Sequence, residues 1–284
     1  MVNKIFKKFD KQVDELVKLG KPKIAFGLKE IDEEILKSLE KSKKYAKITI
    51  VGTSAVGSIK DFNLITDNKP EERIISLLVN NEVDGIIRGT LDDFKTYEIY
   101  EKMTGEKYTI VPGLLEDSLG RQFFISSASN PEGWEKEEKL KITEEIAEFV
   151  KGWGVKPKIA VLAGERHETY PRKKHVREGV VGILNQTYED AEWVVENLKN
   201  KGYDAENLAI DSNIAIENDY NILVPVNGMV GNQMFRILLS CGGKILSATR
   251  LGLSHFYEDN SRSEKDFTFH IKWITALINK KKHE

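Results

Sequence analysis

The stretch PVNGMVGNQMFRILLSCGG, residues 225–243, holds the features that decide the fold. A short apolar strand leads into a glycine-rich turn, and the turn leads into a helix. We expect the helix to bury an apolar face made of Met234, Ile237, Leu238 and Cys241, which recur at helical spacing. A strand that continues through a short turn into a helix is the repeating unit of a parallel sheet.

The glycine-rich turn has two interpretations. Gly228 and Gly231 allow a tight bend, and Asn232 is expected to cap the helix, so the turn needs no ligand. Alternatively, the N–H groups at the helix start bind an anion, because they are unpaired and carry partial positive charge. Taken alone, the pattern favours the plain turn.

Strands and helices alternate over most of the chain. We expect strands at 23–28, 47–52, 83–90, 121–129, 158–164, 206–211, 220–228 and 244–252. We expect helices at 1–20, 30–45, 70–82, 91–105, 137–151, 187–202, 233–241 and 265–280. This predicts an α/β protein with mostly parallel sheets and flanking helices.

A Gly/Pro segment, GWGVKP at 152–157, is typical of a boundary between domains. We therefore predict two α/β domains. The first combines residues 1–155 with 249–284, and the second spans 156–248.

The composition excludes several classes of protein. Lys+Arg is 43 and Asp+Glu is 45 in 284 residues, so the net charge is −2, which argues against a nucleic-acid backbone as the main partner. The single cysteine excludes an internal disulfide and an all-cysteine metal site. No signal-peptide or membrane-spanning stretch is visible, so we expect a cytoplasmic protein with no membrane partner.

Ligands of open α/β sheets lie beyond the carboxyl ends of the strands. In VDGIIRGT, residues 83–90, Arg88 and Gly89 end an expected buried strand. Arg88 is expected to point toward a cleft and hold an anion. The alternative is an ordinary surface arginine at the end of a strand.

The segment EDNSRSEKD, residues 258–266, combines a hydroxyl with a guanidinium. Ser261 and Arg262 suit phosphate or carboxylate, and Asp266 follows one turn later. The alternative is an ordinary helix start, in which Ser263 and Asp266 form a capping box.

The loop GERHETYPRKKHVR, residues 164–177, contains five full cations together with two histidines. With Arg166 and His167 it is a candidate for a polyanionic ligand such as a nucleotide-bearing cofactor. A solvated run of charge is the alternative. His167 and His175 do not have the spacing of a helical metal pair, so we expect no metal site.

Three common site motifs are missing from the sequence. It contains no Walker A sequence, no G-x-S-x-G elbow, and no G-x-G-x-x-G after any expected strand. A standard dinucleotide-binding fold is therefore not supported.

Four segments resemble motifs of the phosphate acetyl/butyryltransferase family. In order along the chain they are VDGIIRGT, GVKPKIAVLAG, NILVPVNGMVGNQMFRILLSCGG and DNSRSEKD. The resemblance covers nearly the whole chain. It implies two α/β domains facing each other across a cleft, as in isocitrate/isopropylmalate dehydrogenase-like folds, with an acyl group passing between coenzyme A and phosphate. It also implies that Ser261 and Arg262 bind phosphate or polarise the acyl carbonyl, Asp266 acts as a base, and Gly231 and Asn232 lie at the cleft wall.

The chain also departs from that family. Arg236 stands where the family usually has lysine, Arg88 replaces a small residue, and GERHETYPR replaces a serine-rich loop. Together with FFISSASNPEGW, this loop is similar to the archaeal Mtx subunit X family, also called methanogenesis marker protein 4. Its members are named as methyltransferase components of methanogens.

These resemblances imply three alternative functions. The first is a transferase component that handles a methyl or acyl group beside an anionic cofactor, coenzyme A-like or other, with arginines stabilising negative charge. The second is a phosphate acyltransferase, and the third is a non-catalytic accessory protein of a methyltransferase or methanogenesis complex. The fold implies a homodimer. The expected anion-binding residues are Arg88, Gly89, Arg166, His167, Gly231, Asn232 and Arg236.

Overall fold

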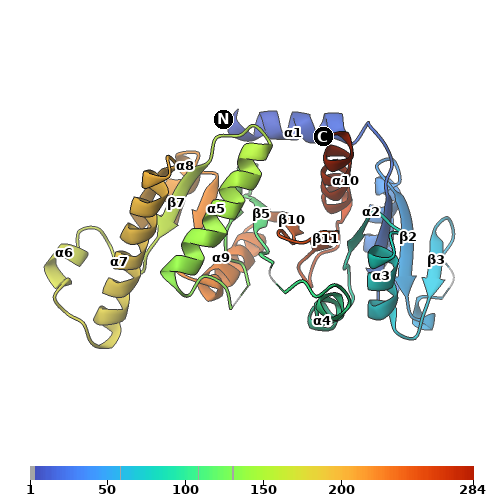
Figure 1. Cartoon of the computed structure of the whole chain (residues 1–284), viewed down its shortest axis with the longest axis horizontal. Coiled ribbons are helices and arrows are strands. Elements are labelled where there is room, and N and C mark those ends of the chain that lie inside the picture. The colour runs from blue at the N-terminus through green and yellow to red at the C-terminus, as the bar shows by residue number, and fades with distance from the viewer. Residues whose placement is uncertain (1–3, 58, 108, 130) are drawn as a thin grey trace. The chain divides into compact units, whose positions relative to one another are not determined.

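The chain folds into two compact units. The computed structural model describes residues 4–57, 59–107, 109–129 and 131–284 (Figure 1). Unit 1 comprises the N-terminal residues as far as Phe9 together with Val111–Ile245, and unit 2 comprises Asp10–Ile110 together with Leu246–Glu284. Both units have mostly parallel strands and flanking helices, so the α/β fold class expected from the sequence is confirmed.

The division into units differs from the domain boundary expected at 152–157. Residues 111–155 group with the segment that follows them, because β6 (Gln122–Ile125) pairs with β9 (Ile222–Val224). The Gly/Pro segment at 152–157 instead joins a helix to a strand inside unit 1.

The sheet of unit 2 has the strand order β3-β2-β1-β4-β11-β10. Its strands are β1 (Lys23–Leu28), β2 (Lys47–Gly52), β3 (Asn63–Thr66), β4 (Gly85–Ile87), β10 (Lys244–Thr249) and β11 (Phe256–Asp259). All neighbouring pairs are parallel except β10 with β11. The chain moves from β1 to β2 on one side and later returns to β4 on the other side. The sheet therefore has a topological switch point between β1 and β4.

Two hydrophobic clusters lie in unit 2. One cluster joins Phe26 of β1 to Leu39 and Ile271, and the other joins Ala25 of β1 to Ile74. Successive residues of β1 thus face opposite sides, as the period of a strand requires. The helices that cover the sheet in Figure 1 are α2 (Glu33–Ser42), α3 (Pro70–Val79), α4 (Asp93–Thr104) and α10 (Thr268–His283), while α1 (Lys4–Leu16) spans the junction of the two units in sequence.

Local capping explains where two of these helices begin. Asp32 accepts hydrogen bonds from the N–H groups of Glu34 and Ile35 at 3.0 and 3.1 Å, so α2 starts directly after it. Asp92 caps α4 in the same way, and Gly105 ends α4 with a left-handed φ of 75°.

The sheet of unit 1 has the strand order β5-β6-β9-β7-β8. The remaining strands are β5 (Gly113–Glu116), β7 (Lys158–Leu162) and β8 (Asp204–Ala209). β6, β9, β7 and β8 run parallel, and β5 pairs antiparallel with β6. Because β8 lies on one side of β7 and β9 on the other, the switch point of this sheet lies between β7 and β9.

The helices of unit 1 are α5 (Lys136–Gly152), α6 (Tyr170–Lys173), α7 (Gly179–Asn200), α8 (Ser212–Glu217) and α9 (Gly228–Ser240). In Figure 1, α5 and α7 lie beside each other over the sheet of this unit. Among the helices of the described ranges, none is long and apolar enough to cross a membrane.

Helix α9 differs from its expected form. It begins at Gly228 and not near residue 233, because Asn227 is its cap and accepts from the N–H of Val230 at 3.0 Å. The expectation that Ile237 and Cys241 are buried was wrong. Ile237 is 63% exposed and Cys241 is an exposed free thiol, whereas the buried residues of α9 are Gly228, Gly231 and Phe235.

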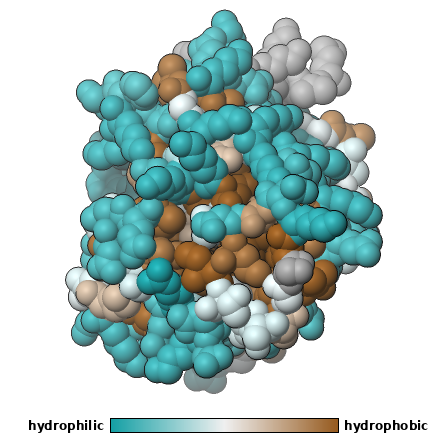
Figure 2. Space-filling view, turned by 90° about the vertical axis from the view of Figure 1, so that its right-hand side faces the viewer, coloured by the Kyte–Doolittle hydropathy of each residue, from teal (hydrophilic) through white to brown (hydrophobic). Residues whose placement is uncertain are grey.

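Unit 2 also exposes hydrophobic side chains on the side where β2 and β3 lie in Figure 1. Figure 2 shows them gathered near the middle of this face, surrounded by hydrophilic side chains. A hollow of about 340 Å³ in unit 2 is lined by Ile31, Leu36, Lys37, Glu40, Ile59, Lys60 and Phe62.

Candidate functional site

The carboxyl ends of β4 and β11 meet at one edge of the sheet in unit 2, because the two strands are parallel neighbours. Arg88 directly follows β4, and Ser261 follows β11 by two residues. Asn260 joins the two segments, since its Nδ2 atom donates to the carbonyl oxygens of Gly89 and Ser261 at 3.0 and 2.8 Å. The structure thus brings Arg88, Gly89 and Ser261 together, beside the switch point of the sheet.

Arg88 is only 3% exposed, and its guanidinium donates hydrogen bonds inside the protein. Its Nε donates to Oδ1 of Asp259 at 2.6 Å, and its Nη1 donates to the carbonyls of Gly89 and Leu91 at 3.0 and 2.9 Å. Its Nη2 donates to the carbonyl of Asn260. The anion-binding role expected for Arg88 therefore gives way to a structural one: it fixes the turn after β4 to the end of β11.

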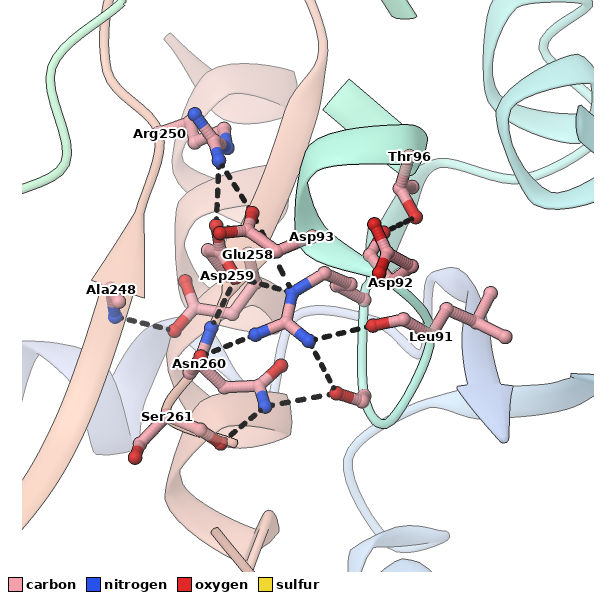
Figure 3. Close-up of polar contacts among 12 residues, drawn as sticks. Leu91, Asp92, Asp93, Thr96, Ala248, Arg250, Glu258, Asp259, Asn260 and Ser261 are labelled. Atoms are coloured by element: carbon pink, nitrogen blue, oxygen red, sulfur yellow. Dashed lines mark hydrogen bonds and ion pairs between the residues drawn. The ribbon is translucent and has the colours of Figure 1, made fainter. Parts of the chain in front are cut away.

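Asp259 is the centre of a buried charge cluster. Its Oδ2 atom accepts from Nη2 of Arg250 at 2.7 Å, and Arg250 also donates to Oδ1 of Asp93 at 3.0 Å (Figure 3). Burial favours the neutral acid, but the charges of Arg250 and Arg88 outweigh it and lower the pKa of Asp259 to about 2. Burial and the nearby Asp259 raise the pKa of Asp93.

Gly89 has no space for a side chain. Its φ is 61°, and a Cβ atom there would lie 2.0 Å from the carbonyl oxygen of Gly27. Gly89 is thus required for the close packing of β1 and β4 at their carboxyl ends.

Ser261 and Arg262 lie at the surface of this edge. The Ser261 hydroxyl is 3.0 Å from the Ser263 hydroxyl, and the Ser261 carbonyl accepts from the N–H of Glu264 at 3.1 Å. Arg262 is exposed, and within the described residues no carboxylate lies at ion-pair distance from it. The segment therefore presents an unneutralised guanidinium on a backbone that is held by buried contacts.

Asp266 serves the start of α10. Its Oδ1 atom accepts from the N–H of Thr268 at 3.0 Å. Burial opposes ionisation, but the hydrogen bonds from Thr268 outweigh it and lower the pKa of Asp266. A carboxylate with a lowered pKa is a weak proton acceptor, which argues against the base role implied by the resemblance.

Behind this segment lies a second buried polar group that the sequence did not indicate. Nδ1 of His270 is 2.7 Å from Oε1 of Glu258, and both residues have no exposed surface. Glu258 also accepts from the N–H of Ala248 at 2.9 Å and from the hydroxyls of Ser247 and Thr249. Burial disfavours the charged imidazole, but the hydrogen bond to Glu258 and the negative charges of Glu258 and Glu264 outweigh it and raise the pKa of His270 to about 9.

In unit 1, the glycines of the turn before α9 face protein backbone. A Cβ atom on Gly228 would lie 1.7 Å from the carbonyl oxygen of Ser129, and one on Gly231 would lie 1.9 Å from that of Ser127. The N–H of Gly228 donates to the carbonyl of Glu132 at 2.7 Å. The glycines therefore serve the packing of α9 onto the loop after β6, and this favours the plain-turn interpretation.

Asn232 and Arg236 extend the same contact. Asn232 donates from Nδ2 to the carbonyl of Ala128 at 2.8 Å, and its Oδ1 accepts from Nε of Arg236 at 2.8 Å. The cap expected at Asn232 is thus supplied by Asn227, and Asn232 ties α9 to the loop after β6. Arg236 is exposed, and its guanidinium forms no ion pair with any of the described residues.

Arg166 and His167 follow β7, at the carboxyl edge of unit 1 beside its switch point. Both are exposed. His167 is held by a hydrogen bond of 2.7 Å between its Nδ1 and the hydroxyl of Tyr188, whose ring stacks on Tyr170 at 4.2 Å. Their anion-binding role stays a prediction. No group of three or more His, Cys, Asp and Glu residues suited to a metal occurs in the part of the chain that was described.

Solved structures of phosphotransacylases have the same fold as this chain. A branched-chain phosphotransacylase from Enterococcus faecalis superposes with a TM-score of 0.67 at 16% identity, covering 89% of this chain and 98% of that one. A phosphotransacetylase from Streptococcus pyogenes superposes with a TM-score of 0.64 at 16% identity, covering 97% and 98%. The chain thus has the phosphotransacylase fold.

The sequence relatives are more specific. Proteins of Methanosarcina barkeri and Methanosarcina mazei, both named "Putative methyltransferase mtx subunit X", are 27% identical to this chain. They align over 93% and 95% of this chain and over 97% and 96% of their own lengths. The resemblance to the Mtx subunit X family indicated by the motifs is therefore confirmed over nearly the whole chain. No model of a known protein family matches the sequence.

Proposed function

We propose that the protein is a component of a methyl-group transferase and that it holds an anionic substrate or cofactor at Ser261 and Arg262. The names of the Mtx subunit X relatives support a methyl group as the group that is transferred. The observation that supports an anionic ligand is the exposed side chain of Arg262. Among the described residues no carboxylate lies at ion-pair distance from it, and it lies at the carboxyl edge of the sheet in unit 2. The planar fork of arginine binds phosphate and carboxylate in bidentate fashion.

The chemistry of the segment fits an anionic group. The charges of Arg88 and Arg250 are offset by Asp259 and Asp93, so Arg262 supplies the cation that is available to a ligand. Ser261 adds a hydroxyl that donates or accepts. A coenzyme A-like cofactor or another phosphate-bearing molecule would meet both groups, and Arg262 would stabilise negative charge that develops during transfer.

Equilibrium dialysis with inorganic phosphate and with coenzyme A tests this proposal. We expect Arg262→Ala to weaken binding about tenfold or more, because a charge-assisted bidentate contact is lost. Arg262→Lys should retain part of the affinity, since it keeps the charge and loses the fork. The matched control is Arg73→Ala, which removes a partly exposed arginine of α3. Equal affinities of wild type and Arg262→Ala would sink the proposal.

The phosphotransacylase fold favours a second candidate, a phosphate acyltransferase. In that reaction the bond between the acyl carbon and the sulfur of coenzyme A breaks, the acyl carbon bonds to a phosphate oxygen, and the leaving thiolate takes up the proton that the phosphate loses. The candidate predicts release of free coenzyme A from acetyl- and butyryl-coenzyme A that depends on phosphate or arsenate. Absence of release with both substrates removes it. If Arg262→Ala also leaves function in the cell intact, the accessory role remains.

A further inference from the structure

Two glutamates flank the Ser261–Arg262 segment, and one histidine faces both. Nδ1 of His270 is 2.7 Å from Oε1 of Glu258, and its Nε2 is 3.9 Å from Oε2 of Glu264. Glu258 lies in β11, three residues before Ser261, and Glu264 lies two residues after Arg262. A single imidazole of α10 therefore spans both ends of the segment.

The two glutamates are themselves anchored in different ways. Glu258 is fixed to β10 through the N–H of Ala248 and the hydroxyl of Ser247. Glu264 uses its Oε1 atom to accept from the N–H groups of Lys265 and Asp266 at 2.9 and 3.0 Å, so it shapes the turn that leads into α10. Its side chain is 16% exposed, whereas those of His270 and Glu258 are fully buried.

The charge of His270 decides whether both contacts exist together. A neutral imidazole carries one N–H, whereas the imidazolium carries two. Nε2 of His270 is buried without a hydrogen-bond partner in the described structure, so its link to Glu264 at 3.9 Å is an attraction between charges. The groups that bear on its titration are Glu258 of β11, Glu264 and, more weakly, Asp266.

We propose that His270 is a positioning residue that closes the Ser261–Arg262 segment by linking Glu258 at its start to Glu264 at its end, and thereby sets the affinity of the site for a phosphate-like anion. The closing of the segment rests on the distances of 2.7 and 3.9 Å from the charged His270 to the two glutamates. The effect on affinity rests on the proposed function.

Two variants break the link at different points. His270→Asn keeps a donor close to the Nδ1 position, so Glu258 stays paired, but it carries no charge and does not reach Glu264. Glu264→Gln keeps the acceptor for the backbone N–H groups and removes the charge that faces His270. The matched control is His255→Asn, because Nδ1 of His255 is also hydrogen-bonded, to the hydroxyl of Tyr100 at 3.0 Å, but lies outside the segment.

Hydrogen exchange of the ligand-free full chain, together with dialysis against inorganic phosphate between pH 6 and 10, tests the proposal. We expect amides 261–266 to exchange about tenfold faster in His270→Asn and Glu264→Gln, with β1 and β4 unchanged. Phosphate affinity should fall about fivefold in both variants. In wild type, phosphate affinity should also fall as the pH rises above 9. In His270→Asn, phosphate affinity should show no such fall. His255→Asn should match wild type.

Each outcome decides the proposal. If both variants exchange at the wild-type rate, His270 does not close the segment. If they exchange faster but bind phosphate as wild type does, the link to affinity is overturned. If wild type binds no phosphate, the proposed function fails, and the exchange of the ligand-free protein still decides the closing. If His270→Asn does not fold, Glu264→Gln gives both measurements, since its carboxylate is near the surface.

Discussion

Arg88 donates from Nε to Oδ1 of Asp259 over 2.6 Å, although 171 positions separate the two residues in the sequence. The pair joins β4, formed early in the chain, to β11, formed near its end. Replacing a buried ion pair by apolar residues is often neutral, but removing one partner leaves a charge buried without compensation. The main contribution of this ion pair is therefore that it fixes the position of the segment after β11.

Arg88→Ala should lower the free energy of unfolding by about 3 kcal/mol or more, because Asp259 stays buried and loses one of its two arginine partners, Arg88, while keeping Arg250. Urea denaturation followed by circular dichroism measures this loss. The control is Arg73→Ala, whose ion pair with Glu82 spans 3.8 Å at the surface and should contribute less than about 1 kcal/mol. Similar small losses in both variants would contradict the structural role of Arg88.

Gly231→Ala should destabilise unit 1 by about 1–3 kcal/mol, since its Cβ would lie 1.9 Å from the Ser127 carbonyl and the helix must shift. Gly152→Ala is the control, because its Cβ meets nothing within 4 Å, and it should be neutral or slightly stabilising. Thermal unfolding compares the two. A Gly231→Ala protein of unchanged stability that loses ligand binding would revive the anion-site interpretation of the turn.

The stability of the protein should fall as the pH rises toward 9.5. The pKa of His270 is raised from 6.5 to about 9 in the folded state, so its contribution is complete below pH 6.5 and is lost as the pH passes through 9. The loss is roughly 3 kcal/mol at most. Urea unfolding at pH 6.5, 7.5, 8.5 and 9.5 measures the slope. His270→Asn should show a flat profile over this range, and a slope equal to that of wild type would assign the effect to other groups.

Asn232→Ala should cost about 1 kcal/mol, because the hydrogen bond to the Ala128 carbonyl and the support of Arg236 are lost together. Hydrogen exchange should increase in the loop after β6 and remain unchanged in β7. Gln233→Ala, an exposed neighbour on the same helix, is the control and should change neither quantity. Equal effects of the two substitutions would mean that Asn232 does not hold the loop.

Much of the secondary structure could be predicted from local patterns. The alternation of apolar strands with amphipathic helices identified β1, β2, β4 and β7 within a few residues, and Gly105 correctly marked the end of α4. β3, β5 and β11 were missed, because four-residue strands offer too short a pattern. The grouping of residues 111–155 with unit 1 depends on the pairing of β6 with β9, and no local pattern encodes which distant strand pairs with another.

The candidate site could be predicted only in part. The sequence identified Arg88, Gly89 and Ser261, which the fold brings together. It did not show that the N–H groups of Arg88 donate hydrogen bonds to acceptors inside the protein. Glu258 and His270 were missed because a glutamate in a strand and a histidine in a helix normally indicate solvent-facing positions. The signal available was a pair of adjacent acidic residues, Glu258 and Asp259, at the end of an otherwise apolar strand.

The exposed sulfhydryl at the end of α9 affects how self-association has to be measured. Two molecules whose Cys241 side chains meet in an oxidising buffer can become joined covalently, and an electrophoresis gel run without reductant would then show a dimer of chemical origin. The homodimer expected from the family resemblance is therefore best sought by sedimentation under reducing conditions, with a Cys241→Ser protein alongside.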